Sequence, residues 1–225
     1  MADEIQTPAD VVIIDTGCAN LSSVRFAFER LGARVEISLD EATLRAAPRL
    51  VLPGVGTAAA AMASLKARGL DKLIPTFTQP VLGVCLGMQL LMTSSKERGA
   101  ENTDIPCLGI IPGEIRELRS NGLPLPHMGW NRLNTSAHPL FNGLSTADWV
   151  YFVHSFCAPE SSYTIASCEY GEAFSAAVAR GNFMGVQFHP EKSAAAGAKI
   201  LKNFLGLTLA DLPKCALQQG SVEPV

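Results

Sequence analysis

The chain has 225 residues, of which 48% are hydrophobic and 17% are charged, a composition that excludes extensive disorder and predicts a large core. Eighteen basic and 21 acidic residues give a net charge of -3, so the positive surface typical of nucleic-acid-binding proteins is not expected. The apolar stretch at 80–92 is interrupted by two glycines and a glutamine and is too short for a membrane span. The six cysteines form no CxxC pair, which favours a reduced, cytoplasmic protein without disulfides or structural zinc.

The first half of the chain predicts alternating strands and helices. Expected strands lie at 11–15, 34–38, 50–52 and 81–84, and expected helices at 21–31, 40–47, 57–68 and 86–94. In the second half we expect short strands and turns at 105–134, strands at 150–158, 163–170, 173–179 and 183–188, and a closing helix at 194–205. Repeated βα units predict an α/β fold with three layers, a flavodoxin-like and mainly parallel sheet with added antiparallel strands. We expect one domain at 11–206, between a flexible amino terminus at 1–10 and a flexible tail at 207–225.

The strongest local pattern is Gly-Val-Cys-Leu-Gly at 83–87, which follows a predicted strand and precedes a predicted helix. A nucleophile on such a sharp turn needs residues without side chains two positions before and after it, so that strand and helix can approach each other. The sulfur of Cys85 would then lie at a helix start, where free N–H groups favour the thiolate, and the N–H of Leu86 could stabilise an oxyanion. The alternative is a structural cysteine in a glycine-rich turn.

A nucleophilic thiol needs a base, and His189 is the best placed of the four histidines because it ends a predicted strand. With a period of two residues, His189 and Glu191 would point the same way from a segment that Pro190 holds extended. The carboxylate could then bind one imidazole nitrogen and leave the other for the sulfur. Active sites form at the carboxyl ends of parallel strands, so the pair indicates acyl transfer through a thioester. The other three histidines, His127, His138 and His154, remain alternatives for the base.

Two weaker patterns suggest other chemistry. Gly54-x-Gly56-x-x-Ala59 fits a loose dinucleotide-binding fingerprint, but Pro53 intrudes and the first strand is elsewhere. A better use of this turn is to present a backbone N–H to Cys85 from a neighbouring strand end. His154 and Cys157 could contact a metal, but two ligands do not make a site.

Three segments together resemble the class I (triad) glutamine amidotransferase family, over about residues 11–206: 53–56, 83–87 and 189–191. Within that family, the stretches at 15–21, 85–91, 126–131, 151–155 and 185–193 resemble the glutaminase subunits of imidazole glycerol phosphate synthase. The resemblance implies hydrolysis of glutamine to glutamate, with ammonia passed to a separate cyclase subunit of (β/α)8 barrel fold in a heterodimer. The cyclase would make imidazole glycerol phosphate and an aminoimidazole carboxamide ribotide in histidine biosynthesis, and no cofactor or metal is implied.

The resemblance also assigns roles to individual residues. It implies that Cys85 is the nucleophile, that His189 is the general base and acid, and that Glu191 orients His189. The backbone N–H groups of Val55 and Leu86 would form the oxyanion hole. The implied substrate-binding residues are Gly54, Gln89, Glu97, Ser155 and Phe156, and the implied partner-interface residues are Asn20, Ser23, Trp130, Tyr151 and Lys192.

Two other functions stay open on the sequence alone. The chain could serve another amidotransferase, such as one for pyridoxal phosphate or for chorismate-derived amination, although the stretch at 126–131 favours histidine biosynthesis. It could also be a flavodoxin-like binding module in which Cys85 is inert. Labelling of Cys85 by an electrophilic glutamine analogue would distinguish an enzyme from a binding module.

Overall fold

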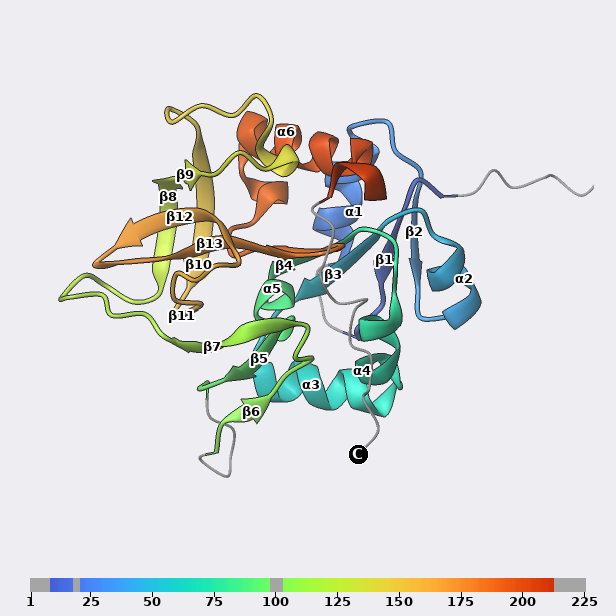
Figure 1. Cartoon of the computed structure of the whole chain (residues 1–225), viewed down its shortest axis with the longest axis horizontal. Helices are drawn as coiled ribbons and strands as arrows, with labels where there is room; N and C mark the ends of the chain where they lie inside the picture. Colours follow the sequence, from blue (N-terminus) through green and yellow to red (C-terminus); the bar gives the residue numbers. More distant parts are fainter. Residues whose placement is uncertain (1–8, 18–20, 98–102, 213–225) are drawn as a thin grey trace, which may run out of the picture.

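The computed structural model describes residues 9–17, 21–97 and 103–212, and an eight-stranded mixed sheet runs through its centre (Figure 1). In sheet order the strands are β2 (Val35–Ser38), β1 (Val11–Ile14), β3 (Leu50–Gly54), β4 (Val81–Cys85), β14 (Phe183–Val186), β13 (Glu172–Arg180), β12 (Thr164–Tyr170) and β9 (Asn134–Thr135). The first five strands are parallel to one another and the last three pair antiparallel. The expected α/β fold with a mainly parallel sheet and added antiparallel strands is confirmed.

Helices cover both faces of the parallel part of the sheet. In Figure 1, α1 (Leu21–Glu29) and α6 (Ala194–Gly206) lie above it, whereas α3 (Ala58–Ala67) and α4 (Leu70–Leu73) lie below it. A short α2 (Glu41–Ala46) packs Leu44 into the lower layer. Along β1, Val11 and Ile13 join the upper layer, while Val12 and Ile14 join the lower one. Both faces of β1 are therefore buried, which explains why its sequence is a continuous apolar run.

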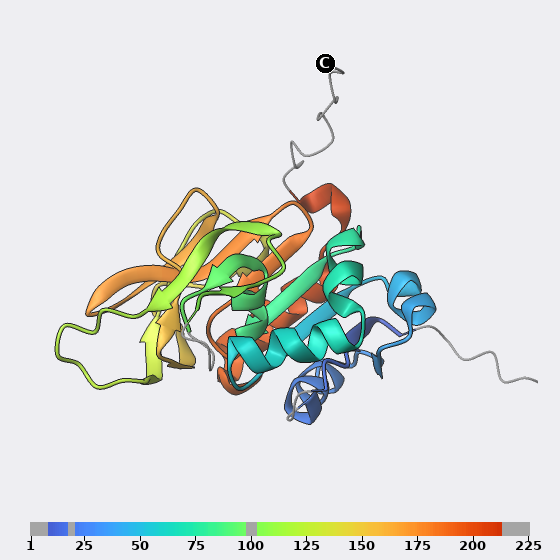
Figure 2. The same cartoon turned by 90° about the horizontal axis from the view of Figure 1, so that it is seen from below.

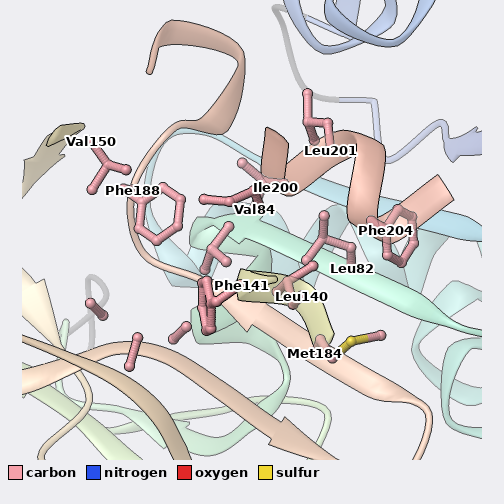
Figure 3. Packing of buried hydrophobic residues seen from close by; sticks show 14 of the residues in the cluster. Leu82, Val84, Leu140, Phe141, Val150, Met184, Phe188, Ile200, Leu201 and Phe204 are labelled. Atoms are coloured by element: carbon pink, nitrogen blue, oxygen red, sulfur yellow. The ribbon is translucent and has the colours of Figure 1, made fainter. Parts of the chain in front are cut away.

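The closing helix α6 supplies much of the upper core. Figure 3 shows Ile200 and Phe204 packing toward Leu82 and Val84 of β4. Phe204 is fully buried and its ring meets that of Phe28 at a centroid distance of 6.4 Å. This packing fixes β4 in position and, with it, the residue at its carboxyl end.

Two smaller sheets lie beside the main one. One contains β11 (Phe156–Cys157), β7 (Ile111–Glu117), β5 (Met92–Ser95) and β6 (Ile105–Pro106), and the other pairs β10 (Trp149–His154) with β8 (His127–Arg132). In Figure 2, the antiparallel strands and the smaller sheets lie at the opposite end of the molecule from α2. Four short 3₁₀ turns complete the described chain: η1 (Ile74–Thr76), η2 (Pro139–Phe141), η3 (Pro190–Lys192) and η4 (Leu209–Asp211).

The expected helix at 86–94 is wrong in its second half. The helix α5 contains only Leu86–Leu90, and the chain continues directly into β5. Met92 pairs with Ile111 of β7, and Ser94 and Ser95 pair with β6 and β7. Pairing with strands later in the sequence overrides the local helical pattern here. The strand expected at 150–158 is likewise divided at Ser155 into β10 and β11, which pair with different strands.

The described chain continues beyond the expected domain limit at 206. Leu207 and Leu212, beyond the expected limit at 206, are buried and belong to the same cluster as α6. Residues 1–8 and 213–225 of the expected flexible ends lie outside the described residues. Across the described ranges, none of the helices has the length and apolar character that crossing a membrane requires.

Candidate active site

Cys85 occupies a sharp turn between β4 and α5. Its backbone has φ 53° and ψ -112°, a left-handed conformation that a residue with a side chain rarely adopts. A Cβ atom added at Gly87 would lie 1.9 Å from the carbonyl oxygen of Leu52, and one at Gly83 would lie 2.7 Å from the oxygen of Gly87. The two flanking glycines therefore allow the close approach of strand and helix that the sequence pattern predicted.

His189 and Glu191 form a hydrogen-bonded pair at the end of the neighbouring strand. Nδ1 of His189 lies 2.8 Å from Oε1 of Glu191, and both side chains are at least nine-tenths buried. The predicted meeting of these residues is found, but the predicted extended segment is wrong, because Pro190–Lys192 form the 3₁₀ turn η3. The turn brings the carboxylate back to the imidazole.

The protonated form of His189 is favoured by its neighbours. Burial alone lowers the pKa of His189, but interaction with Cys85 and Glu191 outweighs burial and raises the pKa to about 9. Nε2 is buried and, among the described residues, makes no hydrogen bond of full geometry. The sulfur is thus close enough to act on the imidazole, while Nε2 stays available for proton transfer. The raised pKa keeps the imidazole of His189 protonated at neutral pH, so it can donate a proton to a leaving group.

The turn after β3 lies next to this pair. Gly54 stands opposite Cys85 in the parallel register of β3 and β4, so the residues that follow, Val55 and Leu86, come from adjacent strand ends. Their backbone N–H groups are thus the candidate donors to an oxyanion. Glu97 holds the end of this loop, since its carboxylate accepts a 2.7 Å hydrogen bond from the N–H of Ala58 at the start of α3. That carboxylate occupies the helix start that a dinucleotide pyrophosphate would need.

The remaining residues that the resemblance implies for substrate binding are Gln89, Ser155 and Phe156, and each has hydrogen-bond contacts within the protein. Gln89 is buried, and its Nε2 donates to the carbonyl of Phe156 at 3.0 Å and to Oε1 of Gln187 at 2.9 Å. Ser155 separates β10 from β11, and its carbonyl accepts a hydrogen bond from the N–H of Leu118. Gln187 was not singled out by the sequence patterns, yet its Nε2 lies 3.8 Å from the sulfur of Cys85. The signal that could have found it is the two-residue spacing from His189.

The other three histidines have different roles in the structure. His138 caps η2 by accepting a hydrogen bond from the N–H of Leu140 at 3.2 Å. His127 and His154 bind each other, with 3.0 Å between Nδ1 of His127 and Nε2 of His154. Because Nδ1 of His154 also bonds to the carbonyl of Phe156, both of its ring nitrogens are engaged within the protein. Within the described ranges, no cluster of three or more His, Cys, Asp or Glu side chains could hold a metal.

Three of the implied interface residues lie together. The ring of Trp130, on β8, meets that of Tyr151, on β10, edge to face at 5.9 Å. Nζ of Lys192, on η3, lies 6.0 Å from the centre of the Tyr151 ring. Trp130 is 49% exposed, so much of its ring faces solvent. Ser23 lies on α1, and Asn20 lies outside the described residues.

Known proteins that are similar to this chain are glutamine amidotransferases. A family model described as glutamine amidotransferase class-I matches residues 12–207. The glutaminase domain of CTPS from Trypanosoma brucei, solved with bound acivicin, is similar with a TM-score of 0.57 and 17% identity, over 92% of this chain and 97% of that chain. A glutamine amidotransferase from Thermotoga maritima gives a TM-score of 0.56 and 19% identity, over 87% and 80%. The family model and the fold together define a class I glutamine amidotransferase.

Relatives with higher sequence identity show to which subgroup of the glutamine amidotransferases the chain belongs. Proteins named imidazole glycerol phosphate synthase subunit HisH match at 61% identity in Shewanella sediminis, over 95% of this chain and 98% of that protein. The corresponding protein of Shewanella oneidensis is 64% identical over 87% and 95%, and that of Vibrio cholerae is 56% identical over 88% and 98%. The chain belongs to the class I glutamine amidotransferase family and, within it, to the HisH subunits of imidazole glycerol phosphate synthase.

Proposed function

We propose that the chain hydrolyses glutamine to glutamate and ammonia through a thioester on Cys85, and passes the ammonia to a cyclase subunit. That subunit would make imidazole glycerol phosphate and an aminoimidazole carboxamide ribotide in histidine biosynthesis. The observation that carries the proposal is a thiol on a strained turn facing a buried imidazole whose other nitrogen binds a carboxylate at 2.8 Å. The high identity to proteins named as HisH subunits supports the same function.

The first half of the reaction forms the thioester. The Cys85 thiolate attacks the side-chain amide carbon of glutamine, and the N–H groups of Val55 and Leu86 stabilise the negative charge on the amide oxygen. His189 in its imidazolium form donates its proton to the leaving nitrogen, so that ammonia departs and the imidazole becomes neutral. Glu191 keeps the imidazole in the orientation that presents Nε2 to the reacting atoms.

The second half hydrolyses the thioester. The neutral imidazole of His189 takes a proton from water, and the resulting hydroxide attacks the acyl carbon. Collapse of this second oxyanion breaks the carbon–sulfur bond and restores the thiolate–imidazolium pair, and the side-chain acid that is released loses its proton to water to become glutamate. Protons and charge balance within Cys85, His189 and water, so the cycle needs no metal or cofactor.

The proposed partner surface lies on β8, β10 and η3. Trp130, Tyr151 and Lys192 form an aromatic and cationic cluster there, and Ser23 and Asn20 are the further residues proposed for docking. Gln89, Glu97, Gly54, Ser155 and Phe156 are proposed to surround the substrate. The domain is proposed to span 11–206 in a cytoplasmic heterodimer, and the free thiols of Cys85, Cys107, Cys157 and Cys168 support a reducing compartment.

The test is covalent labelling by an electrophilic glutamine analogue, with the adduct located by mass spectrometry. We expect the label on Cys85, its loss in Cys85→Ser and slower labelling in His189→Asn. Cys107, Cys157 and Cys168 serve as internal controls, because burial raises the pKa of each, to about 11, 12 and 12. Label on another cysteine, or unchanged labelling in His189→Asn, would support the binding module instead.

A second experiment tests the partner. With the candidate cyclase subunit added, glutamine-dependent ring closure should disappear in Cys85→Ser, while ring closure driven by added ammonium salt should persist. Loss of both reactions in Cys85→Ser would contradict ammonia transfer between separate subunits.

A further inference from the structure

A buried amide that does not belong to the assigned triad lies against the sulfur of Cys85. Gln187 follows β14, is 0% exposed, and places Nε2 at 3.8 Å from Sγ of Cys85. Its Oε1 accepts a 2.9 Å hydrogen bond from Gln89. A fully buried amide side chain is costly unless its groups are paired, so its placement against a reacting atom requires an explanation.

The orientation of the Gln187 amide follows from the carbonyl oxygen of Phe156, to which it is linked through the side chain of Gln89. The carbonyl oxygen of Phe156 can only accept hydrogen bonds, so the atom of Gln89 at 3.0 Å from it is the amide nitrogen. The same nitrogen lies 2.9 Å from Gln187, which must therefore present its oxygen to Gln89. The amide nitrogen of Gln187 then points to the sulfur as a donor.

Two histidines hold the acceptor in place. Nδ1 of His154 lies 2.9 Å from the carbonyl of Phe156, and this nitrogen must carry the hydrogen because a carbonyl cannot donate. Nε2 of His154 then accepts from Nδ1 of His127 at 3.0 Å. Burial lowers the pKa of His154 to about 3 and that of His127 to about 4, so both stay neutral and keep these tautomers. The carbonyl thus has both lone pairs engaged, by His154 and by Gln89.

We propose that Gln187 is a hydrogen-bond donor to the Cys85 thiolate, and that Gln89 and the Phe156 carbonyl are positioning groups for that donor. The inference rests on the proposed function, in which Cys85 is the nucleophile. The thiolate then has two donors, the imidazolium of His189 and the amide of Gln187. Unlike His189, Gln187 keeps its hydrogen throughout the cycle, so it can donate to the sulfur also while the thioester stands and His189 is neutral.

A test of the Gln187 donor must leave the titratable groups near the sulfur unchanged. His189 interacts with Cys85 and binds Glu191, whose charge opposes the thiolate while it supports the imidazolium. A variant of Gln187 replaces neither of them. The variant Gln187→Met has a similar volume without a donor, and Gln187→Glu keeps the contact with Gln89 but turns a negative oxygen toward the sulfur.

The measurement is the rate at which iodoacetamide alkylates Cys85 as a function of pH, with the adduct located by mass spectrometry, alongside kcat/KM for glutamine in the complex with the cyclase. We expect Gln187→Met to lower both the rate at neutral pH and kcat/KM about tenfold, because the sulfur loses a hydrogen-bond donor, and Gln187→Glu to lower them further. The matched control is Gln79→Met, which removes a half-buried amide that donates to the carbonyl of Leu44.

The outcomes separate this inference from the proposed function. If Cys85→Ser still hydrolyses glutamine, the proposed function fails. If Cys85→Ser is inactive while Gln187→Met and Gln187→Glu keep the wild-type alkylation profile and kcat/KM, only the role of Gln187 is wrong. A purely structural role would lower the melting temperature without moving the pH midpoint. Should Gln187→Met not fold, the near-isosteric Gln187→Glu tests the same point.

Discussion

Replacing Glu191 by glutamine should move the alkaline limit of activity to lower pH. The carboxylate lies 2.8 Å from Nδ1 of His189, and with Cys85 it outweighs burial and raises the pKa of the imidazole from 6.5 to about 9. A hydrogen bond to a charged group contributes about 1.5–3 kcal/mol, which corresponds to about one to two pKa units. In Glu191→Gln the limit of about 9 should therefore fall to about 7–8.

The assay is kcat/KM for glutamine hydrolysis between pH 6 and 10, because this ratio reports the groups of the free enzyme. Wild type should lose activity as pH rises through about 9, where the imidazolium loses the proton that it gives to the leaving ammonia. The matched control is Glu172→Gln, which removes a carboxylate that binds Arg116 at 2.6 Å in another part of the fold. An alkaline limit that is the same in wild type and Glu191→Gln would refute the assigned pairing.

The same pKa shift affects folding stability. Because the folded pKa of His189 lies above the unfolded value of 6.5, its contribution to stability is fully present below pH 6.5 and is lost as pH rises through about 9. Urea unfolding should thus show a loss of stability over this range, and the loss should be smaller in Glu191→Gln. A loss of equal size in both proteins would place its origin in another group.

Three further substitutions test packing and docking. Gly87→Ala should destabilise the fold by about 1–3 kcal/mol in urea unfolding, because its Cβ would meet the Leu52 oxygen at 1.9 Å, whereas Gly206→Ala, with open space around it, should not. Phe204→Ala should cost about 3–5 kcal/mol in the same measurement, since its ring is fully buried in the upper core. Trp130→Ala should weaken cyclase binding at least about tenfold by calorimetry without lowering stability, and Leu39→Ala, also exposed, should leave binding unchanged.

The parts of the fold that the sequence predicted are those that depend on neighbours along the chain. The apolar run of β1 and the glycines around Cys85 act through local sterics, so the amino-acid sequence alone was enough to predict both. The half of the expected helix that failed, from Met92 onward, depends on pairing with Ile111 and its neighbours in β7, a strand later in the chain. A tertiary contact decided its conformation, and the local pattern carried no sign of it.

The functional site likewise contains features that the local sequence predicted and features that depend on tertiary contacts. The closeness of His189 and Glu191 was predicted correctly but from the wrong backbone, because Glu191 lies in the 3₁₀ turn η3 and its carboxylate returns to the imidazole from there. Gln187 was missed because its one local signal, the two-residue spacing from His189, does not show by itself that its side chain reaches the sulfur of Cys85. Its contacts form only in the folded protein, where the residues after β14, helix α5 and the segment at Phe156 come together around the amide of Gln89.

Sheet order explains why residues about a hundred positions apart can meet. β3, β4 and β14 are adjacent and parallel, so their carboxyl ends lie side by side and deliver Gly54, Cys85 and the residues after Val186 to one edge. A strand inserted between β4 and β14 would move His189 away from the sulfur by about 4.8 Å, beyond hydrogen-bond reach. The same catalytic residues would then be present in the sequence, but the site would not form. The parallel register of β4 and β14, more than any single side chain, is therefore what makes the thiol and the imidazole one functional unit.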